Sequence, residues 1–282
     1  AYVTVRLTHF TVYWIAAGTD HALRRQLVRG FAGSGFSVVL WFVGAGLPEH
    51  PRLALWFAGW AVDFVGVYVT SRNPGWRLTA ASYFAERFGL IVLIAIGESL
   101  VSIGATVSSQ SLSWRLGGAI LAGLFIAIAL WWLYFDVLVH IAERRLLSLT
   151  GIPRVKLARD SFTYLHLPII TGIVLSALGL KFALEGHSRN VATWSLFGGI
   201  ALYLVSLSAL RRVNLGQWNS QRLVVALVLL GLAPAVVHLS GLGQLVIVAA
   251  LTTCLVAYEA VRFRDVRAQI RHADHDTVEP AL

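Results

Sequence analysis

Long apolar runs constrain this chain more than any other feature of its sequence. One of them is FGLIVLIAIGESLVSIGATV (88–107). A helix that rises 1.5 Å per residue needs about 20 such residues to cross a hydrocarbon core ~30 Å thick. Similar runs follow one another along the chain, and most charged residues lie between them. We therefore expect the lipid bilayer, and not a soluble core, to surround these segments.

The apolar runs predict a chain of membrane-spanning helices with short connections. In lipid each segment must satisfy its own backbone hydrogen bonds, so helices are the natural form. The alternating pattern of barrel strands is absent. Apolar residues make up 57% of the chain and charged ones 13%, compared with about half and a quarter in soluble domains. We predict an all-α, polytopic bundle over 1–262 and a partly disordered cytoplasmic tail over 263–282. The nine predicted spans are 1–18, 30–47, 53–71, 88–107, 116–138, 161–181, 193–210, 223–240 and 245–262.

Basic residues are distributed unevenly among the connections. Most of the 23 Lys and Arg residues follow the first, third, fifth, seventh and ninth spans. Cytoplasmic loops of multi-pass proteins carry the excess of Lys and Arg. We therefore predict a bacterial inner-membrane protein with its C-terminus in the cytoplasm and the residue 1 end on the outer side. The same distribution accounts for the net charge of +9, and we exclude nucleic acid as a partner.

Signatures of soluble enzymes are absent from the sequence. No P-loop, dinucleotide fingerprint, nucleophile elbow or zinc-helix motif occurs. The single cysteine, Cys254, lies inside an apolar run, where a packed thiol is expected. We therefore predict neither a metal nor a cofactor. The chain begins with Ala1 and contains no Met, so we expect the natural protein to begin earlier.

Small residues four positions apart occur on two spans. Ala119, Gly123 and Ala127 form one such series, and Gly172 and Ser176 form another. A stripe of this kind lets a neighbouring helix approach closely. We expect both stripes to serve packing within one subunit, with a dimer interface as the alternative.

Ionisable and polar residues near the middle of three spans form the first candidate site. Such residues are costly in lipid and usually face the bundle interior or a water-filled cavity. Their positions along the spans bring Asp63, Glu98, Arg6 and His9 within one or two helical turns of the same depth. Ser102 lies one turn beyond Glu98 and extends a polar stripe toward the outer surface. Two interpretations remain open: a hydrated path for an ion or proton, or a structural pair between Glu98 and Arg6 or backbone groups.

A second candidate group lies near the cytoplasmic boundary. Asp136 and His140 are one helical turn apart, and His166 enters the next span from the same side. A histidine beside a carboxylate can relay protons. The alternative is a solvated helix end with ordinary ion pairs. The group also contains Glu86, Arg87 and Glu259.

Three stretches resemble the bacterial low temperature requirement protein A family in order and spacing. They are ERFGLIVLIAIGES (86–99), WWLYFD (131–136) and HLPIITGIVLSALGL (166–180), within a likeness that covers most of residues 1–265. The resemblance implies an integral membrane protein, and the family name describes growth in the cold and not a reaction. Members usually begin with an acidic, phenylalanine-rich helix that this chain lacks, and often have a histidine where this chain has Tyr83. The resemblance marks Glu86, Arg87, Glu98 and Asp136 as motif positions.

Three functions are compatible with these features. The first is an ion- or proton-linked transporter or channel that uses the midplane carboxylates. The second is a membrane-embedded enzyme acting on a lipid or isoprenoid, with Asp136 as an acid beside Trp131, Trp132 and Tyr134. The third is a membrane scaffold or sensor. The expected partners are the lipid bilayer, a small ion or small lipophilic molecule, and a second copy of the chain.

Overall fold

The computed structural model describes most of the chain. Its description leaves out residues 1, 71–77, 79, 109–112, 187, 265–266 and 268–282, and the side chains of residues 2, 70, 102 and 106–108. Within the described residues every regular element is helical, which confirms the all-α fold class. Most of the predicted tail, 268–282, lies outside the described residues.

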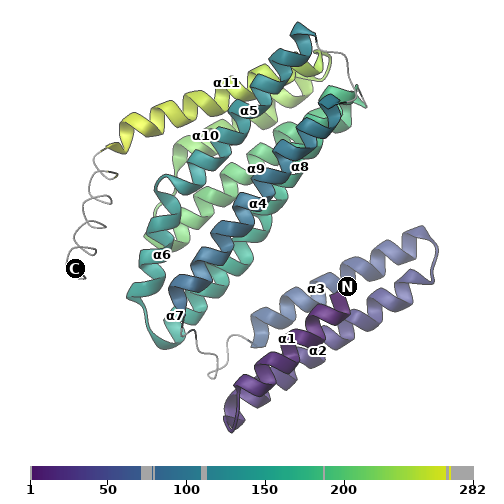
Figure 1. Cartoon of the computed structure of the whole chain (residues 1–282), viewed down its shortest axis with the longest axis vertical. Helices are drawn as coiled ribbons and strands as arrows, with labels where there is room; N and C mark the ends of the chain where they lie inside the picture. Colours follow the sequence, from purple (N-terminus) through teal and green to yellow (C-terminus); the bar gives the residue numbers. More distant parts are fainter. Residues whose placement is uncertain are drawn as a thin grey trace. The chain divides into compact units, whose positions relative to one another are not determined.

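The chain divides into two compact units (Figure 1). The first unit comprises residues Ala1–Thr79 and Thr150–Arg159. The second comprises Ala80–Leu149 and Asp160–Leu282.

The described residues of the first unit form the helices α1 (Tyr2–Ala16), α2 (His21–Ala45), α3 (Glu49–Thr70) and α7 (Gly151–Leu157). The α2 helix begins after Asp20, whose carboxylate accepts hydrogen bonds from the backbone N–H groups of Ala22 and Leu23, both at 3.0 Å. The α2 and α3 helices form a hairpin. Each indole of Trp41 and Trp56 donates to the carbonyl of the other residue, at 3.0 and 3.2 Å. These reciprocal bonds fix the register of the hairpin.

The second unit is a bundle of long helices around one apolar core. Its buried residues come from every long helix of the unit and include Tyr134, Phe197, Ile200, Tyr203 and Leu204. The elements are α4 (Ala81–Ser108), α5 (Trp114–Phe135), α6 (Leu138–Ser148), the π-helix η1 (Ala158–Tyr164) from Asp160 onward, α8 (Leu165–Glu185), α9 (Arg189–Leu215), α10 (Ser220–Val236) and α11 (Gly241–Arg262).

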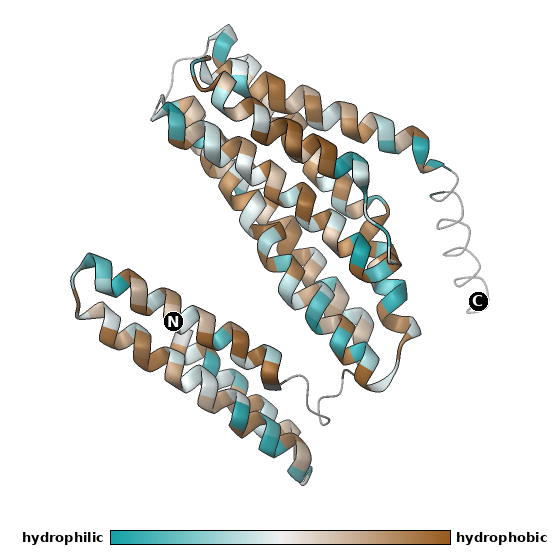
Figure 2. Cartoon of the chain, turned by 180° about the vertical axis from the view of Figure 1, so that it is seen from behind, coloured by the Kyte–Doolittle hydropathy of each residue, from teal (hydrophilic) through white to brown (hydrophobic). Residues whose placement is uncertain are grey.

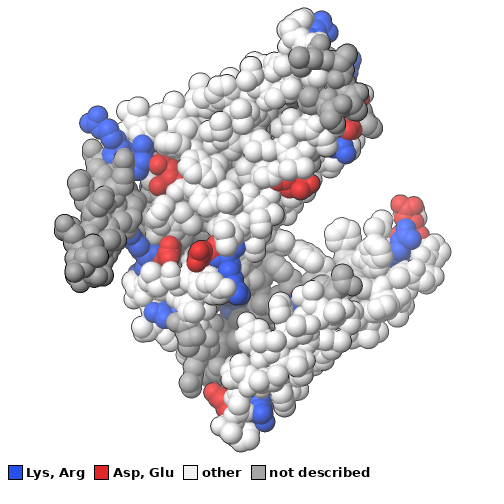
Figure 3. All heavy atoms as spheres, viewed as in Figure 1, with Lys and Arg blue, Asp and Glu red and all other residues white. Residues whose placement is uncertain are grey.

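Helix length and composition identify a membrane protein. Seven helical segments of the described chain are long and apolar enough to cross a bilayer. The α10 helix is apolar but shorter, with 17 residues, and α1 has 15. Figure 2 shows hydrophobic residues along most of these helices, and most of the described surface seen in Figure 3 carries no charge. The chain is therefore a multi-pass membrane protein.

Each predicted span overlaps a helix of the described chain, although the helices at the first and eighth spans, α1 and α10, have only 15 and 17 residues, and the sixth span begins in the π-helical segment Ala158–Tyr164 and continues through α8. The largest difference in boundaries is at the second span, predicted over 30–47, because α2 already begins at His21. Its first turns, HALRRQLVR, are polar, so the apolar pattern alone does not reveal them. The helix of the fifth span ends at Phe135, and the chain continues as the separate helix α6.

The closest helix pair of the second unit is α8 with α9, which lie side by side in Figure 1. Glycines make this approach possible. A Cβ atom on Gly199 would lie 2.5 Å from the backbone nitrogen of Ser176 and 2.8 Å from the carbonyl oxygen of Gly172. A Cβ atom on Gly179 would lie 2.3 Å from the backbone nitrogen of Leu196. The predicted role of Gly172 and Ser176 in packing within the chain is confirmed.

Candidate functional site

A charged pair joins two helices of the first unit. Arg6 of α1 forms an ion pair and hydrogen bond with Asp63 of α3. Ser34 of α2 donates its hydroxyl hydrogen to the other oxygen of Asp63, at 2.7 Å. The Asp63 side chain is 16% exposed, so the carboxylate is largely shielded and already has a cation and a hydroxyl as partners. His9, three residues after Arg6, is exposed.

Glu98 belongs to the second unit and has a different environment. Its side chain is exposed on α4, ten residues before that helix ends at Ser108, or about 15 Å along the axis. Ile94 and Val101, on neighbouring turns, are 69% and 65% exposed. Within the described residues Glu98 has no hydrogen bond or ion pair. The side chain of Ser102 lies outside the described part of the chain.

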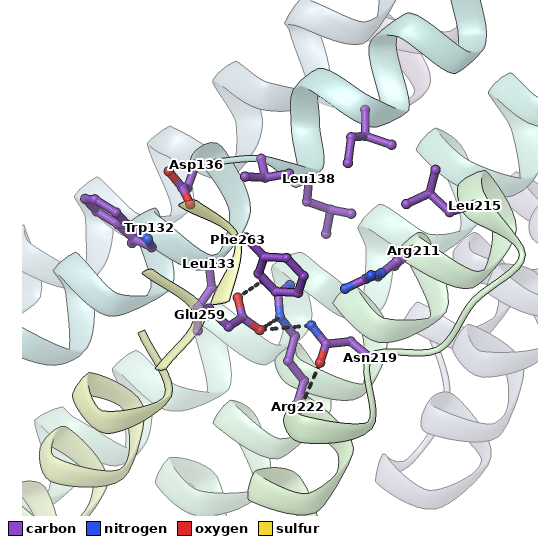
Figure 4. Close-up of a pocket in the computed structure, with 12 residues that line it drawn as sticks. Trp132, Leu133, Asp136, Leu138, Arg211, Leu215, Asn219, Arg222, Glu259 and Phe263 are labelled. Atoms are coloured by element: carbon purple, nitrogen blue, oxygen red, sulfur yellow. Dashed lines mark hydrogen bonds and ion pairs between the residues drawn. The ribbon is translucent and has the colours of Figure 1, made fainter. Parts of the chain in front are cut away.

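A buried ion pair lies at one end of the second unit. Arg222 of α10 donates to both carboxylate oxygens of Glu259 on α11, from Nε at 2.8 Å and from Nη2 at 2.7 Å. Asn219 donates a third hydrogen bond to Glu259, at 2.9 Å, and its side-chain oxygen caps α10. The two charged side chains are only 9% and 6% exposed. Both charges are therefore neutralised inside the protein (Figure 4).

A cavity of about 140 Å³ adjoins this ion pair. A second pair lies beside it, between Asp136 at the end of α5 and Arg267, with 3.1 Å between Oδ2 and Nε. Figure 4 shows Arg211 directed toward the ring of Phe263, and the guanidinium carbon is 5.1 Å from the ring centre. The lining residues are Trp132, Leu133, Asp136, Val137, Leu138, Ile141, Arg211, Leu215, Asn219, Arg222, Glu259 and Phe263.

His166 is enclosed by aromatic side chains in the core of the second unit. Its Nδ1 lies 3.0 Å from the carbonyl oxygen of Ser161, and its Nε2 lies 2.7 Å from the hydroxyl of Tyr134. A carbonyl can only accept, so Nδ1 carries the hydrogen, and the Tyr134 hydroxyl can then donate to Nε2 of the neutral ring. Phe162 stacks on the imidazole with 5.4 Å between ring centres. His166 thus ties α5, η1 and α8 together.

The π-helix η1 helps to shape this cluster. Segments of π-helix are rare and often occur at functional sites. Here η1 contains Ser161, the partner of the imidazole, and Phe162, which stacks on it. Asn214 of α9 donates to the hydroxyl of Ser161 at 2.8 Å. The π-helix therefore connects α8 and α9 through buried polar contacts.

The remaining predicted site residues do not form one cluster. The helix break after Phe135 separates Asp136 from His140, which lies half-buried on α6 with an Nδ1 atom that has no described hydrogen-bond partner. Glu86 is exposed on α4, as is Arg87. Arg87 lies over the ring of Tyr83 and donates to its hydroxyl at 3.0 Å. In the described ranges no group of three or more His, Cys, Asp or Glu side chains could hold a metal ion.

Sequence reasoning missed three residues around Glu259 and the adjoining cavity. They are the cations Arg222 and Arg211 and the amide Asn219. Arg222 and Arg211 lie in a connection between apolar runs, where arginine is expected as a topology signal. Glu259 belongs to the predicted boundary group, but nothing in the sequence indicates its partner. The sequence NSQR (219–222) does carry one local signal, since Asn is a preferred residue before the first turn of a helix.

Comparisons with known proteins agree with this architecture. The sequence family described as bacterial low temperature requirement A protein (LtrA) matches residues 1–257. An uncharacterized protein of Rhizobium meliloti (strain 1021), RA0937, is 29% identical over 223 residues. That match covers 73% of this chain and 52% of the relative, so the chain spans about half the length of that curated relative. No solved structure matches the chain.

Proposed function

Since the chain belongs to the bacterial low temperature requirement A family, whose match covers residues 1–257, we propose that it is an ion- or proton-linked transporter or channel of the bacterial inner membrane. One observation carries the proposal. The carboxylate of Glu98 is exposed among apolar side chains within the membrane-spanning segment Ala81–Ala105, about 15 Å along the axis from the end of α4 at Ser108.

An ionised carboxylate at this depth is expensive to expose to acyl chains, by several kcal/mol. Intramembrane carboxylates accordingly face water-filled cavities or charged partners and mark ion or proton pathways. Glu98 has no protein partner in the described part of the chain. Water, an exchangeable proton or a cation is therefore the partner that fits this carboxylate best.

Asp63 has a supporting role in this proposal. It lies in the membrane-spanning segment Glu49–Val69, and Arg6 and Ser34 already occupy its oxygens. A carboxylate held by an arginine is a poor site for a second cation because the local charge is already balanced. We assign the transported ion or proton to Glu98, and we assign the Arg6–Asp63 pair to holding α1 against α3.

The distribution of Lys and Arg supports one orientation of the chain in the membrane. We propose that the C-terminus is cytoplasmic, because the loops on the same side of the predicted topology carry most of the basic residues. The described end of α11 with Arg262, and the cavity beside Glu259, would then lie near the cytoplasmic surface.

Replacing Glu98 by Gln tests the proposal. Purified protein in liposomes is expected to dissipate an imposed proton or monovalent-cation gradient, measured with an entrapped fluorescent dye. Glu98→Gln keeps the side-chain volume but removes the charge, so the flux should fall at least tenfold. Glu185→Gln is the matched control, because Glu185 lies at the end of α8, in a partly exposed pair with Lys181. Unchanged flux in Glu98→Gln, at equal protein incorporation, would remove Glu98 from the mechanism.

A further inference from the structure

We propose that the cavity beside Arg222 and Glu259 binds a phosphate-bearing anion, either the headgroup of a phospholipid or free phosphate. This site is separate from Glu98 and does not depend on transport. Five segments of the second unit line the cavity: the end of α5, the start of α6, the end of α9, the start of α10 and the end of α11.

The charges around the cavity favour an anion. Two carboxylates line it, and both have cations: Glu259 is bonded at both oxygens by Arg222, and Asp136 is paired with Arg267. Arg211 is a further cation on the same wall, and no ion pair joins it to a carboxylate among the described residues, although Glu259 attracts it from a greater distance. Both carboxylates of the cavity are already paired with arginines, so a cationic ligand would have no free carboxylate to bind. An anion, in contrast, would balance the charge of Arg211.

Unused hydrogen-bond donors point to the same conclusion. The Nε of Arg211 and the indole nitrogen of Trp132 are buried, and neither has a hydrogen-bond partner in the described structure. Both groups can only donate. Buried donors without a partner are unfavourable and call for an explanation. Oxygen acceptors of a ligand in the cavity would supply partners for such donors, which come from α5 and α9.

The size and the apolar part of the cavity define the ligand further. A volume of about 140 Å³ holds a headgroup-sized anion, and it is too small for acyl chains. Leu133, Leu138, Ile141 and Leu215 make the rest of the wall apolar. Basic pockets between membrane-spanning helices on the cytoplasmic side are known to take phospholipid headgroups. A lipid bound here would place its phosphate at Arg211 and its chains outside the cavity.

The test compares two adjacent arginines. Arg211 lines the cavity. Arg212, the next residue of α9, is exposed and does not line it, so it serves as the control. We would measure binding of phosphatidylglycerol and of phosphatidylcholine to the full chain in neutral detergent by native mass spectrometry. Arg211→Gln is expected to weaken phosphatidylglycerol binding about fivefold or more, as the loss of one arginine near a phosphate implies. Arg212→Gln should bind like the unchanged protein, and phosphatidylcholine should bind weakly to all three.

Inorganic phosphate distinguishes the two sources of the anion. If millimolar phosphate displaces phosphatidylglycerol from the unchanged protein, and its ³¹P signal broadens only when Arg211 is present, the site takes free phosphate. If phosphate has no effect while Arg211→Gln loses the lipid, the site takes a headgroup. Equal binding by the Arg211→Gln and Arg212→Gln proteins, or no binding of either anion, would overturn the proposal.

A second variant keeps the test valid if Arg211→Gln does not fold. Trp132→Phe retains an aromatic ring but removes the indole N–H donor. It is expected to weaken binding of the same anion about threefold, close to the loss of one neutral hydrogen bond. Undiminished binding in Trp132→Phe, together with a misfolded Arg211→Gln protein, would also overturn the proposal.

Discussion

Glu259→Gln is expected to lower the free energy of unfolding by about 3 to 5 kcal/mol, the loss typical of breaking a buried ion pair. The glutamine keeps the shape of the side chain and leaves the guanidinium of Arg222 buried without a counter-charge. Arg222 is 9% exposed and donates two hydrogen bonds to this one carboxylate, so water cannot replace the lost counter-charge. Unfolding by sodium dodecyl sulfate in mixed micelles, followed by circular dichroism, measures the loss.

Two further variants separate the burial of this pair from the simple removal of a charge. Glu185→Gln makes the same chemical change in the Lys181–Glu185 pair, whose side chains are 45% and 26% exposed. Its effect should stay below about 0.5 kcal/mol, because exposed i,i+4 pairs contribute little. Removing both buried charges, with Arg222→Met and Glu259→Leu, should recover much of the stability. Similar losses in Glu259→Gln and Glu185→Gln would show that the end of the bundle is hydrated.

Gly199→Ala is expected to destabilise the protein by about 1 to 3 kcal/mol, the usual cost of overpacking a close contact. The added methyl group would lie 2.5 Å from the backbone nitrogen of Ser176, and a backbone cannot rotate away as a side chain can. The α8 and α9 helices would have to separate, and they form the most extensive helix contact of the second unit. Thermal unfolding in detergent measures the change.

The adjacent residue supplies the control. A Cβ atom on Gly198 would have no neighbour within 4 Å. Gly198→Ala should therefore be neutral or stabilise the protein by about 0.5 to 1 kcal/mol, since alanine favours the helix over glycine. Equal melting temperatures for Gly198→Ala and Gly199→Ala would contradict the close approach of the two backbones.

The architecture was predictable because each helix carries its own signal. An apolar run of about 20 residues forms a helix in lipid whatever its neighbours are, so 88–107 and 245–262 identify α4 and α11 without knowledge of the fold. The stripe of small residues formed by Gly172 and Ser176 likewise predicted a close contact between helices. A search for apolar runs does not detect helical turns made of polar residues. For this reason the first turns of α2 were not predicted.

The polar contacts were less predictable because they depend on how helices pack. The proximity of Arg6 to Asp63 follows from equal depth in a bilayer, and the structure brings these two together. Arg222 and Glu259 are 37 residues apart in sequence, and only the packing of α10 on α11 joins them. The sequence places His166 in one boundary group with Asp136 and His140, but the observed partners of His166 are Tyr134 and Ser161. The rotation of each helix about its own axis determines which polar side chains meet. The hydropathy of a sequence does not reveal this rotation.

The accessibility of position 98 to water tests the proposed ion path most directly. Cys254 is the single cysteine, so Cys254→Ser gives a background without thiols. In that background Glu98→Cys is compared with Val174→Cys, at the middle of α8, where the valine is 53% exposed on an apolar surface. We predict that a charged, membrane-impermeant thiol reagent labels position 98 in intact proteoliposomes and leaves position 174 unlabelled. Absence of labelling at both positions would place Glu98 against acyl chains or in a dry contact, and would contradict a hydrated path.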